Sequence, residues 1–319
     1  MDFLQRRTNI ALLFAALTVI ALAPFTVYPM FLMKLMCFAL LAASVNLLVS
    51  YIGLLSFGHA MFYGAAGYVT AHAVKVWGWD GAAGIFAGVA TAALVGLVTG
   101  LLAIRRQGIY FSMITLAFAQ LVYFIALRMP FTGGEDGIQE IPRPMVFGWL
   151  SLQGTMTLYY FVAAMVVFGF WLIYRTVHSP FGQILRAIRD NEPRAQSLGY
   201  RVNRYKLLAF VLSAALAGLA GSLKVLVFQL ASLTDVHWAT SGEALLICIV
   251  GGMHTLLGPV IGSIVIVSME NYLASFAEWV LIIQGAVFVL VVMLFRKGIV
   301  GQLYTYLATR RQRRAAASA

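Results

Sequence analysis

The chain has 319 residues, of which 62% are hydrophobic and only 10% are charged. A soluble domain is about 45–50% apolar and about 25% charged, so this composition excludes a soluble fold and predicts an all-α polytopic membrane protein. The formal net charge of +11 does not indicate nucleic-acid binding, because the basic residues lie in a few loops that flank apolar runs. Cys37 and Cys248 lie in apolar segments, so they indicate neither a disulfide nor a metal site.

The apolar runs predict about ten transmembrane segments, with a range of eight to ten and some helices short or broken. The runs are 9–28, 31–50, 52–74, 82–104, 109–127, 157–174, 207–230, 243–254, 255–270 and 279–295. Glycines and a proline interrupt residues 243–270, which therefore fit either two short segments or one re-entrant loop and one span. No cleavable signal peptide is expected, because the first run is too long for one.

Lysine and arginine are concentrated at four places in the sequence. These are Arg6 and Arg7, Arg105 and Arg106, the loop 175–206, and the stretch from Arg296 to Arg314. Ten crossings place all four on one side, which the positive-inside rule makes cytoplasmic, together with both termini. The expected organisation is one transmembrane domain, residues 1–296, with a cytoplasmic loop at 175–206, and a basic tail, residues 297–319.

The segments also predict an internal inverted repeat. Segments two to five and seven to ten form two groups of four that enter the membrane from opposite sides, which is a common plan among transporters. Glycines support the repeat in the second segment of each group, where Gly58, Gly64 and Gly67 match the spacing of Gly252, Gly258 and Gly262 to within one residue. This glycine match is weak by itself, because the chain has 29 glycines.

The loop SPFGQILRAIRDNEPRAQSLGYR, residues 179–201, predicts two short amphipathic helices. Ser179 and Asn191 are expected N-caps, each with a proline in the first turn that follows, and Gly199 is expected to end the second helix. An apolar stripe recurs at helical spacing in the first helix: Phe181, Ile184, Leu185 and Ile188. We expect this stripe to pack partly against this chain and partly against another protein.

Enzymatic motifs do not occur in the sequence. It contains no G-x-x-x-x-G-K-[ST] phosphate loop, no H-E-x-x-H, no C-x-x-C and no G-x-S-x-G, so the chain is not expected to be an enzyme or to hydrolyse ATP. Lys224 lies within a segment and Glu243 and Glu270 lie near segment ends, where snorkelling or interfacial placement is favoured over ion coupling. For His59 and His72, a buried structural role is favoured over pore lining.

A small and polar stretch, Ser56 to Tyr68, interrupts the third segment. Such breaks face protein or a cavity, so a helix lining a translocation path and tight glycine packing are both consistent with it. The candidate path residues are Ser56, Phe57, Gly58, His59, Gly64, Gly251, Gly252 and Gly258. The loop 128–156 contains FTGGEDGIQEIPRP, for which a solvated loop is favoured over a docking site or a gate.

Four blocks of sequence resemble one family. The runs LLSFGHAMFYGAAGY, GIYFSMITLAFAQLVYFI with TGGEDGI, SPFGQILRAIRDNEPRAQSLGYRVNRYKLLAFVLSAALAGLAGSL and GGMHTLLGPVIGS resemble the M-type permease subunit of branched-chain amino acid ABC importers. The resemblance covers most of residues 31–296. It implies a bacterial inner-membrane protein with four kinds of neighbour: a second, different permease, two cytoplasmic ATPase subunits, a periplasmic binding protein and the lipid bilayer. It implies no cofactor on this chain, with ATP used by the partner subunits.

The resemblance assigns contact with the ATPase to the loop 179–201. The residues concerned are Phe181, Gly182, Ile184, Leu185, Arg186, Ile188, Arg189, Glu192, Ala195 and Gly199. The family's E-A-A-x-x-x-G pattern is degenerate here, because Pro193 occupies the glutamate position and Glu192 comes one residue early. His254 also departs from the family pattern, which has a glycine there.

The function that the resemblance implies is ATP-driven import of branched-chain amino acids by alternating access. Two alternatives remain open. One is a permease for urea or short amides within the same class of importer. The other is a stand-alone secondary carrier or channel, which transport by the purified chain without ATP would support.

Overall fold

The structure is a computed structural model that describes residues 18, 20–253, 255–273, 280–294 and 298–302. Its long helices are α2 (Pro29–Tyr51), α3 (His59–Lys75), α4 (Gly81–Ala103), α5 (Ile109–Arg128), α6 (Thr155–Val177), α9 (Val202–Phe228), α11 (Trp238–Gly251), α12 (Gly258–Leu273) and α13 (Val280–Leu294). Short elements join them: α7 (Pro180–Asp190), α8 (Glu192–Ser197), α10 (Leu233–Val236), the 3-10 turns η1 (Ala23–Phe25) and η2 (Pro130–Thr132), and the antiparallel pair β1 (Met145–Val146) and β2 (Leu150–Ser151). The predicted all-α polytopic membrane class is confirmed.

Five helices in the described part of the chain are long and apolar enough to cross a membrane: α2, α4, α5, α6 and α9. Helices α11 and α12 are shorter and also apolar. The first predicted segment, 9–28, lies mostly outside the described residues, and its last part is the η1 turn rather than a regular helix. The prediction of about ten crossings therefore stays a prediction.

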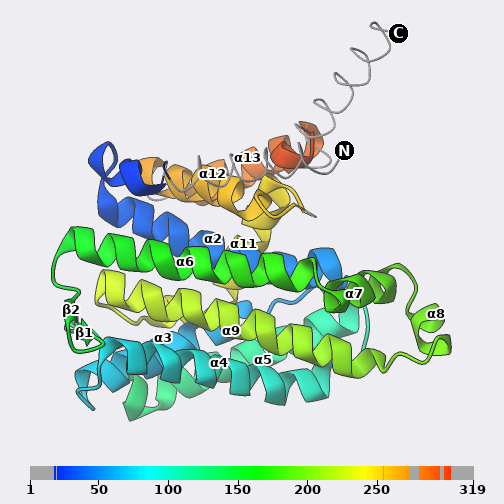
Figure 1. The fold of residues 1–319 in the computed structure, drawn as a ribbon, viewed down its shortest axis with the longest axis horizontal. Coiled ribbons are helices and arrows are strands. Elements are labelled where there is room, and N and C mark those ends of the chain that lie inside the picture. The colour runs from blue at the N-terminus through cyan, green and yellow to red at the C-terminus, as the bar shows by residue number, and fades with distance from the viewer. Residues whose placement is uncertain (1–17, 19, 254, 274–279, 295–297, 303–319) are drawn as a thin grey trace, which may run out of the picture.

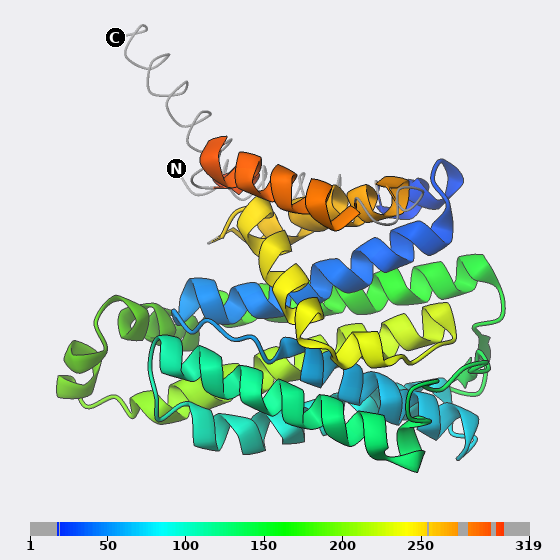
Figure 2. The ribbon, with the colours of Figure 1, turned by 180° about the vertical axis from the view of Figure 1, so that it is seen from behind.

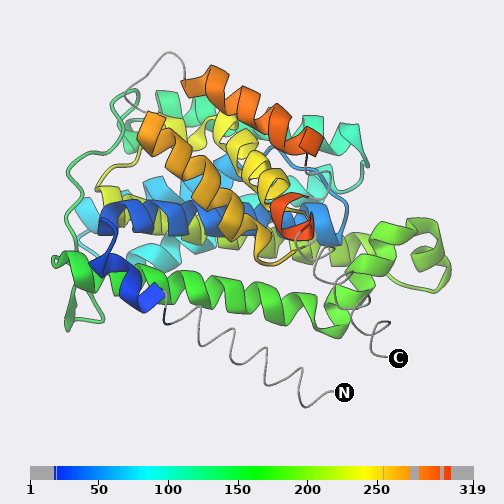
Figure 3. The same cartoon turned by 90° about the horizontal axis from the view of Figure 1, so that it is seen from above.

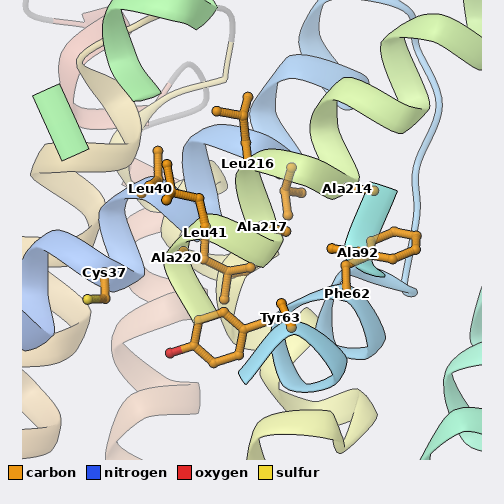
Figure 4. Close-up of a cluster of buried hydrophobic side chains, with 14 of the residues drawn as sticks. Cys37, Leu40, Leu41, Phe62, Tyr63, Ala92, Ala214, Leu216, Ala217 and Ala220 are labelled. Carbon is orange, nitrogen blue, oxygen red and sulfur yellow. The ribbon is translucent and has the colours of Figure 1, made fainter. Parts of the chain in front are cut away.

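The centre of the bundle is formed by α9 and α2, with α3 packed against α9 (Figure 1). Small residues at three-residue spacing, Ala214, Ala217 and Ala220, line α9 and let its neighbours approach closely (Figure 4). Leu40 and Leu41 of α2 and Tyr63 of α3 surround them and are almost completely buried. Helix association in lipid depends on such close packing, because burying apolar surface gains little there.

The outermost layer on one side consists of α12 and α13, which cover α2 and α11 (Figures 2 and 3). The elements α7 and α8 project from one end of the bundle, and the β1–β2 pair lies at the other end (Figure 1). The basic loop 175–206 and the acidic loop 128–156 are thus on opposite ends, as their charges predict.

The predicted repeat is visible in how the helices pack. If α2, α3, α4 and α5 are exchanged for α9, α11, α12 and α13, the packing pairs map onto one another. Thus α3 packs on α4 and α9, whereas α11 packs on α12 and α2. The glycine correspondence is wrong, however, because α11 ends at Gly251 and places Gly258 and Gly262 in the next helix.

Candidate functional site

The third apolar segment does not begin as a helix. Residues 52–58 lie outside regular helices, with a turn at Ile52 and a bend at Phe57, and α3 begins only at His59, which corrects the predicted helical start at residue 52. The exposed backbone groups of this break find partners on α5: the Ser112 hydroxyl donates to the Leu55 carbonyl at 2.6 Å, and the Phe57 amide donates to Thr115 Oγ1 at 3.3 Å. Non-helical backbone inside a membrane needs such partners, because lipid offers none.

His59 marks the point where the chain resumes its helix, and its side chain is completely buried. Its Nε2 lies 2.9 Å from Ser213 Oγ on α9, and that hydroxyl donates to the Ser44 carbonyl on α2 at 2.6 Å. Because the single Ser213 proton is used toward Ser44, His59 Nε2 is the donor in the first bond. His59 is thus buried and hydrogen-bonded, as the favoured interpretation expects, and its Nδ1 has no hydrogen-bond partner among the described residues.

A second break lies between α9 and α11, at residues 229–237. Ser232 and Asp235 form a capping box at the start of α10, and Lys224 Nζ on α9 lies 2.6 Å from Asp235 Oδ2. The ammonium of Lys224 is therefore paired with a carboxylate of the same chain, and its snorkelling or interfacial placement stays a prediction. The same pair fixes the short helix α10 against the end of α9.

The two breaks meet inside the bundle. The Ala60 amide, in the first turn of α3, donates to Ser241 Oγ of α11 at 2.8 Å. Gly64 of α3 packs directly against Val236 of α10, so closely that an added Cβ would overlap the valine side chain. The first turns of α3 and α11, which belong to opposite halves of the repeat, are thus in direct contact.

The loop 128–156 holds the second break at its outer end. Ile138 and Ala231 exchange backbone hydrogen bonds of 3.0 and 2.9 Å, and the Gln229 side chain donates to the Ile141 carbonyl at 2.9 Å. Gly137 is required for this contact, because its φ is +67° and a Cβ would overlap the Ala231 carbonyl. The favoured reading of a merely solvated loop is therefore wrong for residues 137–141, which brace the segment that leads to α11.

The candidate path residues fall into two groups. Ser56, Phe57, Gly58, His59 and Gly64 lie at the first break, where Ser56 is buried and its hydroxyl accepts from the Gly58 amide at 3.2 Å. Gly251, Gly252 and Gly258 lie instead at the tightly packed turn between α11 and α12, away from His59. The Asn46 side chain of α2 holds that turn by donating to the Thr255 carbonyl at 2.9 Å. His254 lies outside the described residues.

Sequence reasoning missed three serines at the meeting point: Ser44, Ser213 and Ser241. The available signal was a serine hydroxyl in each of three mostly apolar helices, which needs a partner in lipid. That signal says nothing about which partner is used. Only the packing of α2, α3, α9 and α11 brings the three together.

Lys34 is also paired within the described part of the bundle, because its Nζ lies 3.1 Å from Glu270 Oε2 of α12. The carboxyl of Glu243 on α11 lies beside that of Glu270, and its Oε1 has no hydrogen-bond partner among the described residues. His72 is partly buried and stacks on Phe131 with ring centres 4.0 Å apart, so the buried role expected for it stays a prediction. Ionisable groups in membrane segments are expected to pair as Lys34 and Glu270 do, so that pair requires no ion-coupling role.

The two short helices predicted for residues 179–201 are confirmed with their caps. The Ser179 hydroxyl accepts from the Gly182 amide at 3.3 Å, and the Asn191 side chain accepts from the Arg194 amide at 3.0 Å. Gly199 has a φ of +86°, which ends α8 as expected.

The apolar stripe of α7 packs against this chain. Leu185 and Ile188 are buried, and Ile188 forms a small cluster with Ala195 and Val202. Of the predicted ATPase-contact residues, Gly182, Leu185, Ile188 and Ala195 are buried, Phe181, Ile184 and Glu192 are partly buried, and Arg186, Arg189 and Gly199 are exposed. The outward face of α7 consists instead of Gln183, Arg186, Ala187 and Asp190, at positions i, i+3, i+4 and i+7.

Glu192 is also engaged within the chain. Its Oε2 lies 2.6 Å from Lys206 Nζ of α9, and the two side chains are only 16% and 3% exposed. This pair fixes α8 against the first turns of α9. The displaced glutamate of the degenerate pattern therefore has a partner in its own chain.

Comparison with known proteins gives a consistent result. The family described as branched-chain amino acid transport system / permease component matches residues 27–292. The high-affinity branched-chain amino acid transport system permease protein LivM of Escherichia coli strain K12 is 28% identical over 286 residues, covering 81% of this chain and 66% of that protein. The chain thus spans slightly less than two thirds of the length of this relative.

Two other relatives are also named as permease proteins. An autoinducer 2 import system permease protein, LsrC of Klebsiella pneumoniae, is 29% identical over 64% of this chain and 60% of its own length. A probable branched-chain amino acid transport permease protein, LivH of Methanocaldococcus jannaschii, is 32% identical over 46% of this chain and 47% of its own length. No solved structure matches the chain.

Proposed function

Because the chain belongs to the family of branched-chain amino acid transport permease components, we propose that it is the transmembrane permease subunit of an ATP-driven importer of branched-chain or other hydrophobic amino acids. ATP is hydrolysed by separate cytoplasmic ATPase subunits, and a periplasmic binding protein delivers the substrate. A second, different permease completes the membrane unit, and this chain binds no cofactor. It lies in the bacterial inner membrane with both termini in the cytoplasm.

The observation that carries the proposal is the contact between the helix starts that follow the two breaks, through Ala60 of α3 and Ser241 of α11. Transporters of several folds place discontinuous helices from two repeats at the substrate path, where backbone groups and helix starts meet polar parts of the cargo. Here one break follows α2 and the other follows α9, and α9 is the counterpart of α2 in the repeat. When the two breaks move one after the other, the substrate path opens to one side of the membrane and then to the other, as alternating access requires.

The alternatives have less support. A stand-alone carrier driven by ions needs ionisable groups that take up and release the ion, whereas Lys34, Lys206 and Lys224 each have a carboxylate partner in this chain. The similarity to an autoinducer 2 permease indicates that related chains serve other cargoes, so urea or a short amide remains a second candidate within the importer class.

The test is uptake by the assembled importer in liposomes. We expect the chain, combined with its second permease, ATPase and binding protein, to take up labelled leucine only when ATP is present. Unlabelled isoleucine and valine compete, and urea does not. Uptake by the chain alone without ATP contradicts the importer, and competition by urea alone contradicts the amino acid substrate.

Docking of the ATPase is proposed for the outward face of α7. Ala187 is exposed at the centre of this face, so Ala187→Trp places a large side chain where the ATPase must approach. We expect ATPase co-purification to fall about tenfold, a loss of about 1.4 kcal/mol in binding free energy. The measurement is the amount of ATPase recovered with the tagged permease.

The matched control is Ala83→Trp, an exposed alanine at the start of α4, at the end of the bundle opposite to α7. It adds the same side chain and should leave ATPase recovery unchanged. Equal recovery with Ala187→Trp and Ala83→Trp places the ATPase elsewhere.

A further inference from the structure

The end of α2 is in direct contact with α7. Arg189 Nη1 donates to the Ser50 carbonyl, one of the last carbonyls of α2. The last carbonyls of a helix have no partner within it and carry partial negative charge, so a guanidinium is well placed there. Asp190 holds the same guanidinium from the other side, with its Oδ1 accepting from Nη2 at 2.9 Å.

Arg189 also covers the point where the chain leaves α2. Gly53 has a φ of +79°, which turns the chain into the first break, and a Cβ at Gly53 would lie 3.1 Å from Arg189 Cγ. Beside it, the guanidinium carbon of Arg186 lies 5.4 Å from the centre of the Tyr51 ring. Two arginines of α7 therefore contact residues 50–53.

From Gly53 the chain reaches His59 in six residues. Along this path Leu55 is bound to Ser112 of α5, and His59 is bound to Ser213 of α9. The segment 52–58 is therefore short and held at both ends, by Arg189 beside Gly53 and by Ser213 at His59.

We propose that Arg189 is a positioning residue that transmits the movement of α7 to the segment 52–58 and so shifts the start of α3 at His59. This rests on the proposed function, in which an ATPase moves α7. It assigns Arg189 a role different from direct ATPase contact, because its guanidinium is directed toward α2.

The test compares Arg189→Met with Arg189→Lys in the assembled importer. Met removes the donor and keeps an apolar stem over Gly53, whereas Lys keeps the charge without the planar fork. We expect Arg189→Met to retain ATPase assembly and ATP hydrolysis while the amount of substrate transported per ATP falls about tenfold. Arg189→Lys recovers part of this ratio, and Arg175→Met, an exposed arginine at the end of α6, leaves it unchanged.

A second measurement separates transmission from simple destabilisation. Both native cysteines are buried, and Leu55 is 41% exposed, so Leu55→Cys provides a single reactive thiol on the segment 52–58. We expect ATP to change its maleimide labelling rate in the importer with Arg189 and not in the importer with Arg189→Met.

An unchanged transport ratio and an unchanged ATP response of the thiol in Arg189→Met overturn the proposal. A variant that loses assembly and melts at a lower temperature, with the ratio intact in the complexes that remain, also overturns it, because Arg189 is then only structural. If no ATPase co-purifies with the unaltered chain, the proposed function itself fails.

Discussion

Replacement of Gly221 by alanine is expected to cause a large loss of folded protein. Gly221 lies on α9 where α3 crosses it, and an added Cβ would overlap the carbonyl oxygen of Tyr63 and lie 2.7 Å from its carbonyl carbon. These are backbone atoms, so no change of rotamer relieves the overlap and the two helices must separate. Overpacking costs about 1–3 kcal/mol or more in well-packed interiors, and we expect a melting temperature lower by roughly 5 °C or more.

Two other glycines provide graded controls for this prediction. A Cβ at Gly67 would be 2.9 Å from a methyl group of Val225, which is a side chain that can be shortened, and Gly242 has no heavy atom within 4 Å. We expect Gly67→Ala to have a smaller effect that Val225→Ala relieves, and Gly242→Ala to have little effect. Thermal unfolding in detergent, followed by tryptophan fluorescence, measures all of them. Equal melting temperatures for Gly221→Ala and Gly242→Ala contradict the packing described here.

The second large effect is expected for Glu192→Gln. This change leaves the Lys206 ammonium, which is 3% exposed, without its carboxylate at 2.6 Å. Removing one partner of a buried ion pair costs roughly 3–5 kcal/mol, because the remaining charge is uncompensated. We expect a lower melting temperature and faster proteolysis within residues 191–201, since α8 is no longer tied to α9.

The double variant Glu192→Gln, Lys206→Met should recover much of this loss, because it removes the uncompensated charge. Asp190→Asn is the matched control, since the Arg189–Asp190 pair is 32% and 65% exposed and such pairs contribute about 0–1 kcal/mol. If Asp190→Asn destabilises the protein as much as Glu192→Gln does, burial does not explain the effect.

Both predictions depend on contacts between segments that are far apart in the chain. The sequence predicted the caps at Ser179 and Asn191, because these are local patterns. It did not predict that Glu192 pairs with Lys206, or that Gly221 meets Tyr63. Such pairings follow from how the helices cross, which no local pattern specifies.

In the candidate site, too, local sequence patterns were predictable and contacts between distant segments were not. A break near Ser56 was predictable, because small and polar residues in an apolar segment require protein or a cavity around them. Its extent up to His59 was not, because the backbone groups of Leu55 and Phe57 bond to Ser112 and Thr115 of α5, which are far away in the sequence. The second break, after Phe228, was not predicted, because its sequence resembles an ordinary connection between the end of one apolar run and the start of the next.

By itself, the sequence determined the membrane class, the order of most helices, the two halves of the repeat and the capped helices of residues 179–201. These follow from hydrophobic periodicity, charge placement and residue-specific backbone preferences, which act over a few residues. Only the tertiary structure decided that Leu185 and Ile188 of the α7 stripe are buried in their own chain, and that Arg189 lies on the end of α2. It also brought His59, Ser213 and Ser241 to one place, because side chains far apart in sequence become neighbours only when the two halves pack together.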